Sequence, residues 1–232
     1  VVSGVTGTSL QSKSFTSINI PDNVDVGKGV FSGVNISGNV TIGKNCTINI
    51  GSFNQSSATD GCTIRNFTIG EGTTIKGNFA ECADVSKMTI KSGCTVIGKA
   101  LQSMTIDELN IESGVTLRDS SQNSRLTMGG SIRKLTCDSN IGSYNFMLLT
   151  GLEEVYIGEN VTSIGSYAFE KDTNIKKLYI GGGVTKINQF AFSGCTSLDD
   201  ITINNSEGTI KIDTTSFKDV PAYTNGTIKY LK

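Results

Sequence analysis

Apolar residues recur along the chain in a six-residue pattern, L-x-x-L-x-I, whose last two apolar positions are separated by one residue. In the last third of the chain, the pattern occupies Leu152–Ile157, Ile175–Ile180 and Leu198–Ile203, each copy beginning 23 residues after the one before. Successive side chains of a strand point to opposite faces, so this alternation predicts a short strand with one apolar face.

The same hexad recurs towards the N-terminus, at spacings between about 20 and 27 residues. These copies are Ile132–Cys137, Ile106–Ile111, Val85–Ile90, Ile64–Ile69, more loosely Ser37–Ile42, and Phe15–Ile20. A single coil cannot bury its apolar face, but stacked coils share one continuous core. The nine copies therefore predict a solenoid whose hexads pair as a parallel sheet.

Two further elements follow the hexads. A segment of the form G-x-V-T-x-I, as at 181–187, predicts a turn and a second extended stretch, with positive φ angles expected at Gly181–Gly183. In the last two full coils, Ala168-Phe169 and Ala191-Phe192 predict a helical or 3₁₀ turn before the next strand. The N-terminal coils lack Ala-Phe, which predicts looser or more purely β outer segments there.

Composition narrows the possible chemistry. The chain has no histidine, which removes Ser-His-Asp and Cys-His nucleophile systems and every His-bearing metal site. A net charge of −1 with 18% charged residues leaves no basic surplus for nucleic acid. No apolar run approaches the roughly 18 residues of a membrane span. We therefore expect no enzyme activity, no cofactor or metal, no nucleic-acid partner and no direct membrane insertion by this segment.

The six cysteines form no close pair, and most occupy apolar positions of the repeat. Cys46 and Cys94 stand where other coils have valine, Cys137 stands where they have isoleucine, and Cys82 and Cys195 lie three residues before a hexad. This placement favours buried free thiols. A reactive thiol or a structural disulfide stays open as the alternative.

The segment Ile175–Leu198, with its L-x-x-L-x-I, G-V-T-x-I and A-F-x-x-C-T-S-L elements, resembles the BspA-type (Treponema pallidum-like) leucine-rich repeat of bacterial surface proteins. The resemblance is strongest over 152–203, fair over 64–151 and weak over 1–63. It implies an exported protein on the bacterial cell surface or outside the cell. Several relatives are adhesins that bind host matrix proteins or act in coaggregation, and the family brings no catalytic residues.

We accordingly expect a leucine-rich-repeat right-handed solenoid over residues 1–232, mostly β with short helical or 3₁₀ turns and a single parallel sheet along the concave face. Residues 1–63 would form degenerate coils and a cap, 64–212 the leucine-rich repeats, and 213–232 a capping strand resembling those that close such arrays. The alternative is a right-handed parallel β-helix in the N-terminal half, a fold that hosts polysaccharide-active enzymes.

The outward positions of the hexads carry charged pairs that alternate in sign from coil to coil. The pairs are Asp107/Glu108, Arg133/Lys134, Glu153/Glu154, Lys176/Lys177 and Asp199/Asp200. Neighbouring parallel strands would bring opposite charges together, so the pattern favours an ionic ladder that fixes the register. A charged binding strip for a polyanion would have one sign throughout.

Tyr156 and Tyr179 occupy equivalent outward positions and should stack on adjacent strands. The stack could merely stabilise the sheet, or it could anchor a ligand. The candidate ligand-binding face comprises Tyr156, Tyr179, Glu154, Lys177, Arg133 and Asp200. The leading hypothesis is a non-enzymatic adhesion module that binds a host or bacterial surface protein or glycan. A β-helix polysaccharide-active enzyme and a structural spacer are the alternatives, and the oligomeric state stays open.

Overall fold

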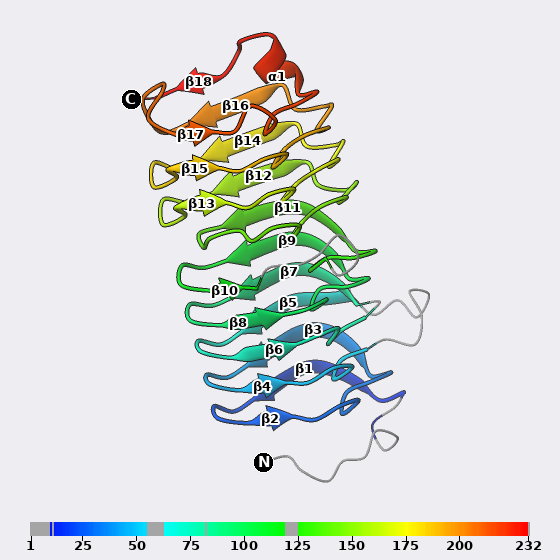
Figure 1. The fold of residues 1–232 in the computed structure, drawn as a ribbon. Helices are drawn as coiled ribbons and strands as arrows, with labels where there is room; N and C mark the ends of the chain where they lie inside the picture. Colours follow the sequence, from blue (N-terminus) through cyan, green and yellow to red (C-terminus); the bar gives the residue numbers. More distant parts are fainter. Residues whose placement is uncertain (1–9, 11, 55–62, 82, 119–124, 232) are drawn as a thin grey trace.

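A parallel ten-stranded sheet runs the length of the solenoid (Figure 1). The computed structural model describes residues 10, 12–54, 63–81, 83–118 and 125–231. In spatial order the strands are β1 (Ser14–Ile20), β3 (Asn35–Ile42), β5 (Thr63–Ile69), β7 (Asp84–Ile90), β9 (Thr105–Ile111), β11 (Ser131–Cys137), β12 (Glu154–Ile157), β14 (Lys177–Ile180), β16 (Asp200–Ile203) and β18 (Lys229–Tyr230). All but β18 coincide with a predicted hexad, so the repeat and its mostly-β solenoid fold are confirmed.

The prediction of a single sheet is incomplete, because the segments that follow the hexads also pair. A five-stranded parallel sheet contains β2 (Asp25–Val26), β4 (Thr47–Ile48), β6 (Thr74–Lys76), β8 (Thr95–Ile97) and β10 (Thr116–Leu117). A three-stranded sheet contains β13 (Ser163–Ile164), β15 (Lys186–Ile187) and β17 (Lys211–Ile212). A second parallel strand thus follows the hexad in both halves of the chain, except in the coil of β11, where Ile141 forms only an isolated bridge with Ile164. The fold class does not change between the halves.

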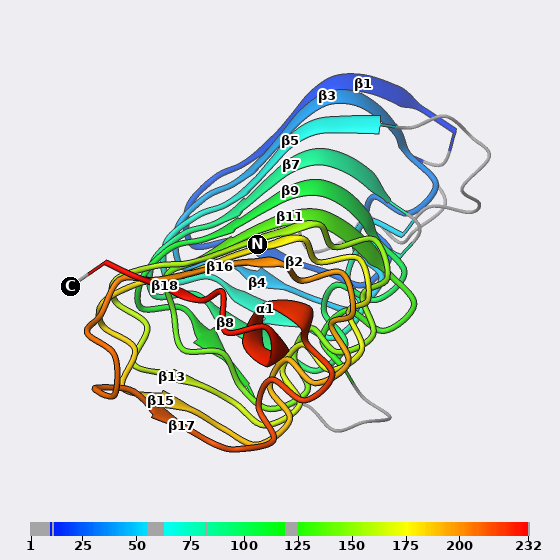
Figure 2. The ribbon, with the colours of Figure 1, turned by 90° about the horizontal axis from the view of Figure 1, so that it is seen from above.

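One short helix, α1 (Pro221–Thr224), is present among the described residues and lies across the C-terminal end of the stack (Figure 2). Ala222 of α1 is buried, and the Tyr223 ring stacks on Phe217 with centroids 5.4 Å apart. Within the described ranges no helix is long and apolar enough to span a bilayer. The helix therefore covers apolar side chains that the last coil would otherwise expose.

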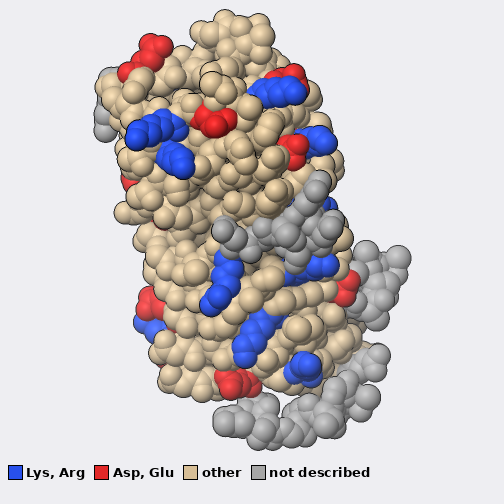
Figure 3. Space-filling view, viewed as in Figure 1, with Lys and Arg blue, Asp and Glu red and all other residues tan. Residues whose placement is uncertain are grey.

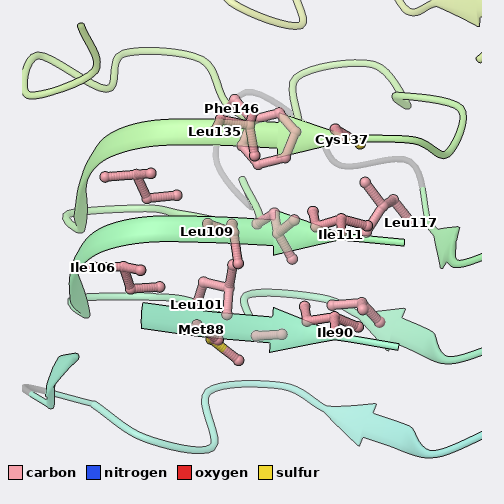
Figure 4. Close-up of a cluster of buried hydrophobic side chains, with 14 of the residues drawn as sticks. Met88, Ile90, Leu101, Ile106, Leu109, Ile111, Leu117, Leu135, Cys137 and Phe146 are labelled. Carbon is pink, nitrogen blue, oxygen red and sulfur yellow. The ribbon is translucent and has the colours of Figure 1, made fainter. Parts of the chain in front are cut away.

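The core consists of the inward side chains of all coils, stacked in rows (Figure 4). Cys46, Cys94, Cys137 and Cys195 are free and buried in it, as predicted, while Cys82 lies outside the described residues. Burial raises the pKa of the Cys94 thiol to about 11 and that of Cys137 to about 12. These two thiols stay protonated at neutral pH, which makes them poor nucleophiles.

Buried phenylalanines form a stacked row inside the C-terminal coils. Phe169 lies between Phe146 and Phe192, with ring centroids 5.4 Å and 5.0 Å away. The turns that carry these rings are closed by hydrogen bonds between residues three apart, such as Cys195 N–H to the Phe192 carbonyl at 3.2 Å. None of these turns is itself an α-helix, and α1 is the one helix among the described residues.

The expectation of looser outer segments in the N-terminal coils is wrong. Phe53 and Leu101 occupy the equivalent turn position there and are buried. The backbone N–H of Leu101 donates to the next coil at Leu126, as Phe169 donates to Ala191. The prediction failed because it required the residue pair Ala-Phe, whereas Ser52-Phe53 and Ala100-Leu101 form the same buried turn.

The hexad read at Ser37–Ile42 also needs correction. Ser37 is exposed, and the first buried position of that strand is Ile36, which pairs with Phe15. The register shifts between Phe15 and Ser17, so β3 contains one extra residue, a β-bulge. The extra residue shifts the apolar pattern in the sequence by one position, but β1 and β3 stay paired on both sides of it.

The glycines at 181–183 have another role than the one predicted, since none of them has a positive φ. A Cβ built on Gly181 would lie 2.6 Å from the carbonyl oxygen of Gly158, and one on Gly183 would overlap the carbonyl oxygen of Glu159. Close approach of the preceding coil's backbone, and not a left-handed turn, therefore requires glycine here.

The carboxyl group of Asp172 is fully buried. Its Oδ1 accepts a hydrogen bond from the Leu149 N–H at 2.6 Å, whereas Oδ2 has no hydrogen-bond partner among the described residues. Burial raises the pKa of this carboxyl well above its usual range, although the Leu149 and Leu148 amides and Arg125 act in the opposite direction. Asp172 thus stays protonated at pH values where the unfolded chain has lost this proton.

We predict that Asp172→Asn becomes increasingly more stable than wild type as the pH rises above about 4, the ordinary pKa of the aspartate in the unfolded chain. Between the unfolded and the raised folded pKa, the folded wild type binds more protons than the unfolded chain, so its stability falls with rising pH. Asparagine keeps an acceptor for Leu149 and does not ionise. Thermal melts of both proteins across this pH range measure the difference.

Asp107→Asn is the matched control, because its stability difference from wild type should change with pH in the opposite direction. A hydrogen bond with Arg133 lowers the pKa of Asp107, so its contribution is present above the unfolded pKa and lost as the pH falls. The asparagine variant should therefore lose stability relative to wild type as the pH rises. A melting difference for Asp172→Asn that does not depend on pH would contradict the buried, protonated carboxyl.

Candidate functional site

The outward charges of the large sheet form the predicted ionic ladder. Ion pairs join Lys87 to Glu108, Arg133 to Asp107, Lys134 to Glu154 and Lys176 to Glu153, each across neighbouring strands. The N–O distances for the Lys134 and Lys176 pairs are 3.1 Å and 3.7 Å. Such exposed pairs contribute only about 0.2–1 kcal/mol each, and they favour one register over a slipped one.

Tyr156 and Tyr179 lie in register on β12 and β14 and stack face to face, with centroids 4.5 Å apart and planes inclined by 1°. Tyr156 is 43% exposed and Tyr179 is half-buried. The residues in register beyond the pair are Thr136 and Thr202. Because threonine is small, the outer face of each ring borders open space above the sheet.

Glu159 lies in the turn that follows β12 and accepts a hydrogen bond from one tyrosine of the pair. Its Oε1 accepts hydrogen bonds from the Tyr179 hydroxyl at 3.0 Å and from Asn204 Nδ2 at 3.1 Å, while Oε2 accepts the Gly182 N–H at 2.6 Å. Burial, followed by the hydrogen bond to Glu159, raises the pKa of Tyr179 to about 12. Tyr179 is therefore a neutral phenol with a fixed orientation at physiological pH.

A shallow depression of about 280 Å³ surrounds the two tyrosines. Its lining includes Glu154, Lys177 and Asp200, so five of the six predicted residues lie together. Glu154 and Asp200 are engaged with Lys134 and Lys229, at 3.1 Å and 2.9 Å. Lys177 takes part in none of the ion pairs between described residues. The depression thus offers two aromatic rings beside an available ammonium group.

The sixth predicted residue, Arg133, lies elsewhere. It pairs with Asp107 and lines a separate depression of about 320 Å³ over β7, β9 and β11. Sequence reasoning missed Glu159, because nothing in its turn signals a contact two coils away. The roles of Thr136 and Thr202 could have been read from the hexad register.

Cations engage four of the carboxylates on the outward face of the large sheet. Glu108, Glu153 and Glu154 each have a lysine partner, and Asp107 has Arg133. A hydrolase needs a carboxylic acid and a second carboxylate about 5–10 Å apart that are free to act on the substrate. Within the described ranges, no group of three or more Cys, Asp or Glu residues is placed to hold a metal ion.

Comparison with known proteins establishes the family. A family model described as "BspA type Leucine rich repeat region (6 copies)" matches residues 7–125 and 130–229. The chain belongs to the BspA-type leucine-rich-repeat family. Members of this family of surface proteins are typically not enzymes. A search of curated proteins gives no significant match.

Three solved structures are similar to this BspA-type chain. A leucine-rich repeat protein from Bacteroides ovatus is 17% identical, with 94% of this chain and 84% of that chain covered and a TM-score of 0.40. A leucine rich cell surface protein from Faecalibacterium prausnitzii is 17% identical, with coverages of 94% and 79% and a TM-score of 0.35. The pneumococcal vaccine antigen PcpA is 13% identical, with coverages of 97% and 80% and a TM-score of 0.31.

Proposed function

We propose that this BspA-type chain is an exported, non-enzymatic binding or adhesion module of a bacterial cell surface. It recognises a host or bacterial surface protein or glycan through the outward face of the ten-stranded sheet. The observation that carries the proposal is the depression around Tyr156 and Tyr179, with the ammonium group of Lys177 beside them.

The chemistry of this depression suits recognition. Tyrosine presents a large apolar ring at a low cost in conformational entropy, and aromatic residues are enriched among the anchors of protein interfaces. Stacking and the Glu159 hydrogen bond already immobilise the two rings, so little freedom is lost on binding. Lys177, placed between two acids that have other partners, can pair with an acidic group of the ligand.

The spacer alternative makes a different prediction. If the tyrosines only stabilise the sheet, their removal should lower stability by at least the roughly 0.5–1.5 kcal/mol of an aromatic pair and change no binding. The enzyme alternative has less support, because ion pairs engage the carboxylates it would use.

The test is binding of the wild-type chain to immobilised host matrix proteins, glycans and whole bacterial cells. We expect binding to at least one of them, and a loss of about tenfold or more, equal to about 1.4 kcal/mol, in Tyr156→Ala/Tyr179→Ala. Lys177→Gln should weaken the same binding. Tyr223→Ala, at the C-terminal cap, is the control and should bind like wild type.

Two results would count against the proposal. Absence of binding to every surface tested contradicts a binding module. Binding that is unchanged in the double tyrosine variant contradicts the site while leaving the module intact.

A further inference from the structure

Two lysines lie side by side on the small sheet of the C-terminal coils. Lys186 of β15 and Lys211 of β17 are partners in the parallel register, and both are exposed. Neighbouring strands are about 4.8 Å apart, so the two side chains leave the sheet close together. Figure 3 shows Lys and Arg atoms gathered over β15 and β17.

This arrangement differs from that of the large sheet. On the large sheet, neighbouring strands place opposite charges together, as with Lys176 and Glu153. Like charges directly opposite one another destabilise a sheet. Local choices that work against the fold, when nothing nearby compensates for them, are typical of functional sites.

One acid, Asp213, borders the pair without forming an ion pair with either lysine. Neither Lys186 nor Lys211 takes part in an ion pair between described residues. Asp213 lines the same hollow, where its Oδ1 accepts hydrogen bonds from the Thr215 N–H at 2.9 Å and the Thr215 hydroxyl at 2.6 Å. These hydrogen bonds, and after them the charge of Lys186, lower the pKa of the Asp213 carboxyl. Two ammonium groups thus face one carboxylate, which leaves a net positive charge to attract an anion.

The lysines border a hollow of about 450 Å³, within the range of roughly 300–1,000 Å³ that is typical of ligand sites. Ser166, Asn188 and Gln189 contribute hydroxyl and amide groups to its lining. These groups can hydrogen-bond to hydroxyls of a ligand. Ile187 and Ile212 complete the lining, and its many hydrogen-bonding groups suit a sugar better than an apolar segment of a protein.

A second aromatic row adjoins this hollow. Tyr144, Tyr167 and Phe190 are stacked, with successive centroids 4.9 Å and 5.1 Å apart, and all three are only partly buried. Their φ values of 60°, 59° and 55° lie in the left-handed region, which disfavours such side chains. The Tyr167 N–H donates to the carbonyl of Gln189, a residue of the hollow, at 3.1 Å.

We propose that the Lys186/Lys211 hollow binds a sulfate or carboxylate group of an acidic polysaccharide, whose sugar rings extend towards the Tyr167/Phe190 row. Paired ammonium groups provide the charge that an anionic substituent needs, and the amide and hydroxyl lining provides partners for sugar hydroxyls. A nucleic acid would need a longer basic stripe. The site is independent of the Tyr156/Tyr179 depression, which lies on the other sheet.

The test uses heparin oligosaccharides, which carry both sulfate and carboxylate groups, in calorimetric titrations of the full chain at low salt. We expect wild type to bind, with affinity that falls as salt is added. The double variant Lys186→Gln/Lys211→Gln should bind heparin with an affinity at least tenfold lower than that of wild type. Lys76→Gln, which removes an exposed lysine of β6, and Tyr156→Ala/Tyr179→Ala should bind like wild type.

Absence of heparin binding by wild type would overturn the proposal. So would a loss of affinity in Lys76→Gln equal to that in Lys186→Gln/Lys211→Gln. Single-stranded DNA that binds as tightly as heparin would overturn the assignment to a polysaccharide. Lys186→Glu distinguishes a direct loss of binding from a loss caused by unfolding. It replaces the two like charges at positions 186 and 211 by a pair of opposite charges. It should abolish heparin binding without lowering the melting temperature, and a loss of binding that accompanies a lower melting temperature would contradict a direct role.

Discussion

Phe169→Ala should lower the free energy of unfolding by about 3–5 kcal/mol, the usual loss for a buried phenylalanine. The Phe169 ring is fully buried between Phe146 and Phe192, and coils above and below hold those neighbours in place. The surrounding structure cannot collapse into the space without disturbing the stack, so a cavity remains. Urea denaturation of both proteins measures the difference.

Tyr156→Ala provides the comparison, because Tyr156 is also stacked but 43% exposed. Its removal should lower the free energy of unfolding by less than Phe169→Ala does, because only part of the Tyr156 ring is withdrawn from water. If Phe169→Ala were no more destabilising than Tyr156→Ala, the phenylalanine row would not be the stabilising core of the C-terminal coils.

Gly183→Ala should lower the free energy of unfolding by about 3 kcal/mol, at the upper end of the usual cost of overpacking. The added Cβ would overlap the carbonyl oxygen of Glu159, a backbone atom of the preceding coil. Backbone cannot rotate away as a flexible side chain can, so the two coils must separate locally. The same movement would disturb the Glu159 hydrogen bonds that orient Tyr179.

Gly27→Ala is the matched control. Gly27 has no positive φ, and its added Cβ would meet only Val30 Cγ2, at 3.4 Å. It should therefore change stability by less than about 0.5 kcal/mol. Equal losses in Gly183→Ala and Gly27→Ala would contradict close coil-to-coil approach at Gly183.

The hexads and the large sheet were predictable because a strand of a solenoid obeys two local rules. Alternation in Leu178 and Ile180 identifies the buried face, and the fixed spacing of the copies sets the register with the next coil. The same register predicted that Lys176 would meet Glu153 and that Tyr156 would meet Tyr179. Each of these contacts joins equivalent positions of adjacent coils, so the aligned copies contain the information.

Features that depend on backbone shape were not predictable in this way. The positive φ angles of Tyr144 and Tyr167, and their absence at Gly181–Gly183, reflect how each turn meets the coil before it. The bulge beside Ile36 shifts the alternation by one residue and so conceals the register. Glu159 contacts Asn204, 45 residues further along the chain, and no spacing rule connects them.

Hydroxyl-radical footprinting shows directly whether ligands bind over the stacked tyrosines. The chain is labelled with and without whichever matrix protein, glycan or cell surface it binds, and modification is compared at Tyr156 and at Tyr223, each 43% exposed. Binding should protect Tyr156 and leave the modification rate of Tyr223 unchanged. Bound protein in which Tyr156 is modified as fast as in the free chain would contradict binding over the stacked tyrosines.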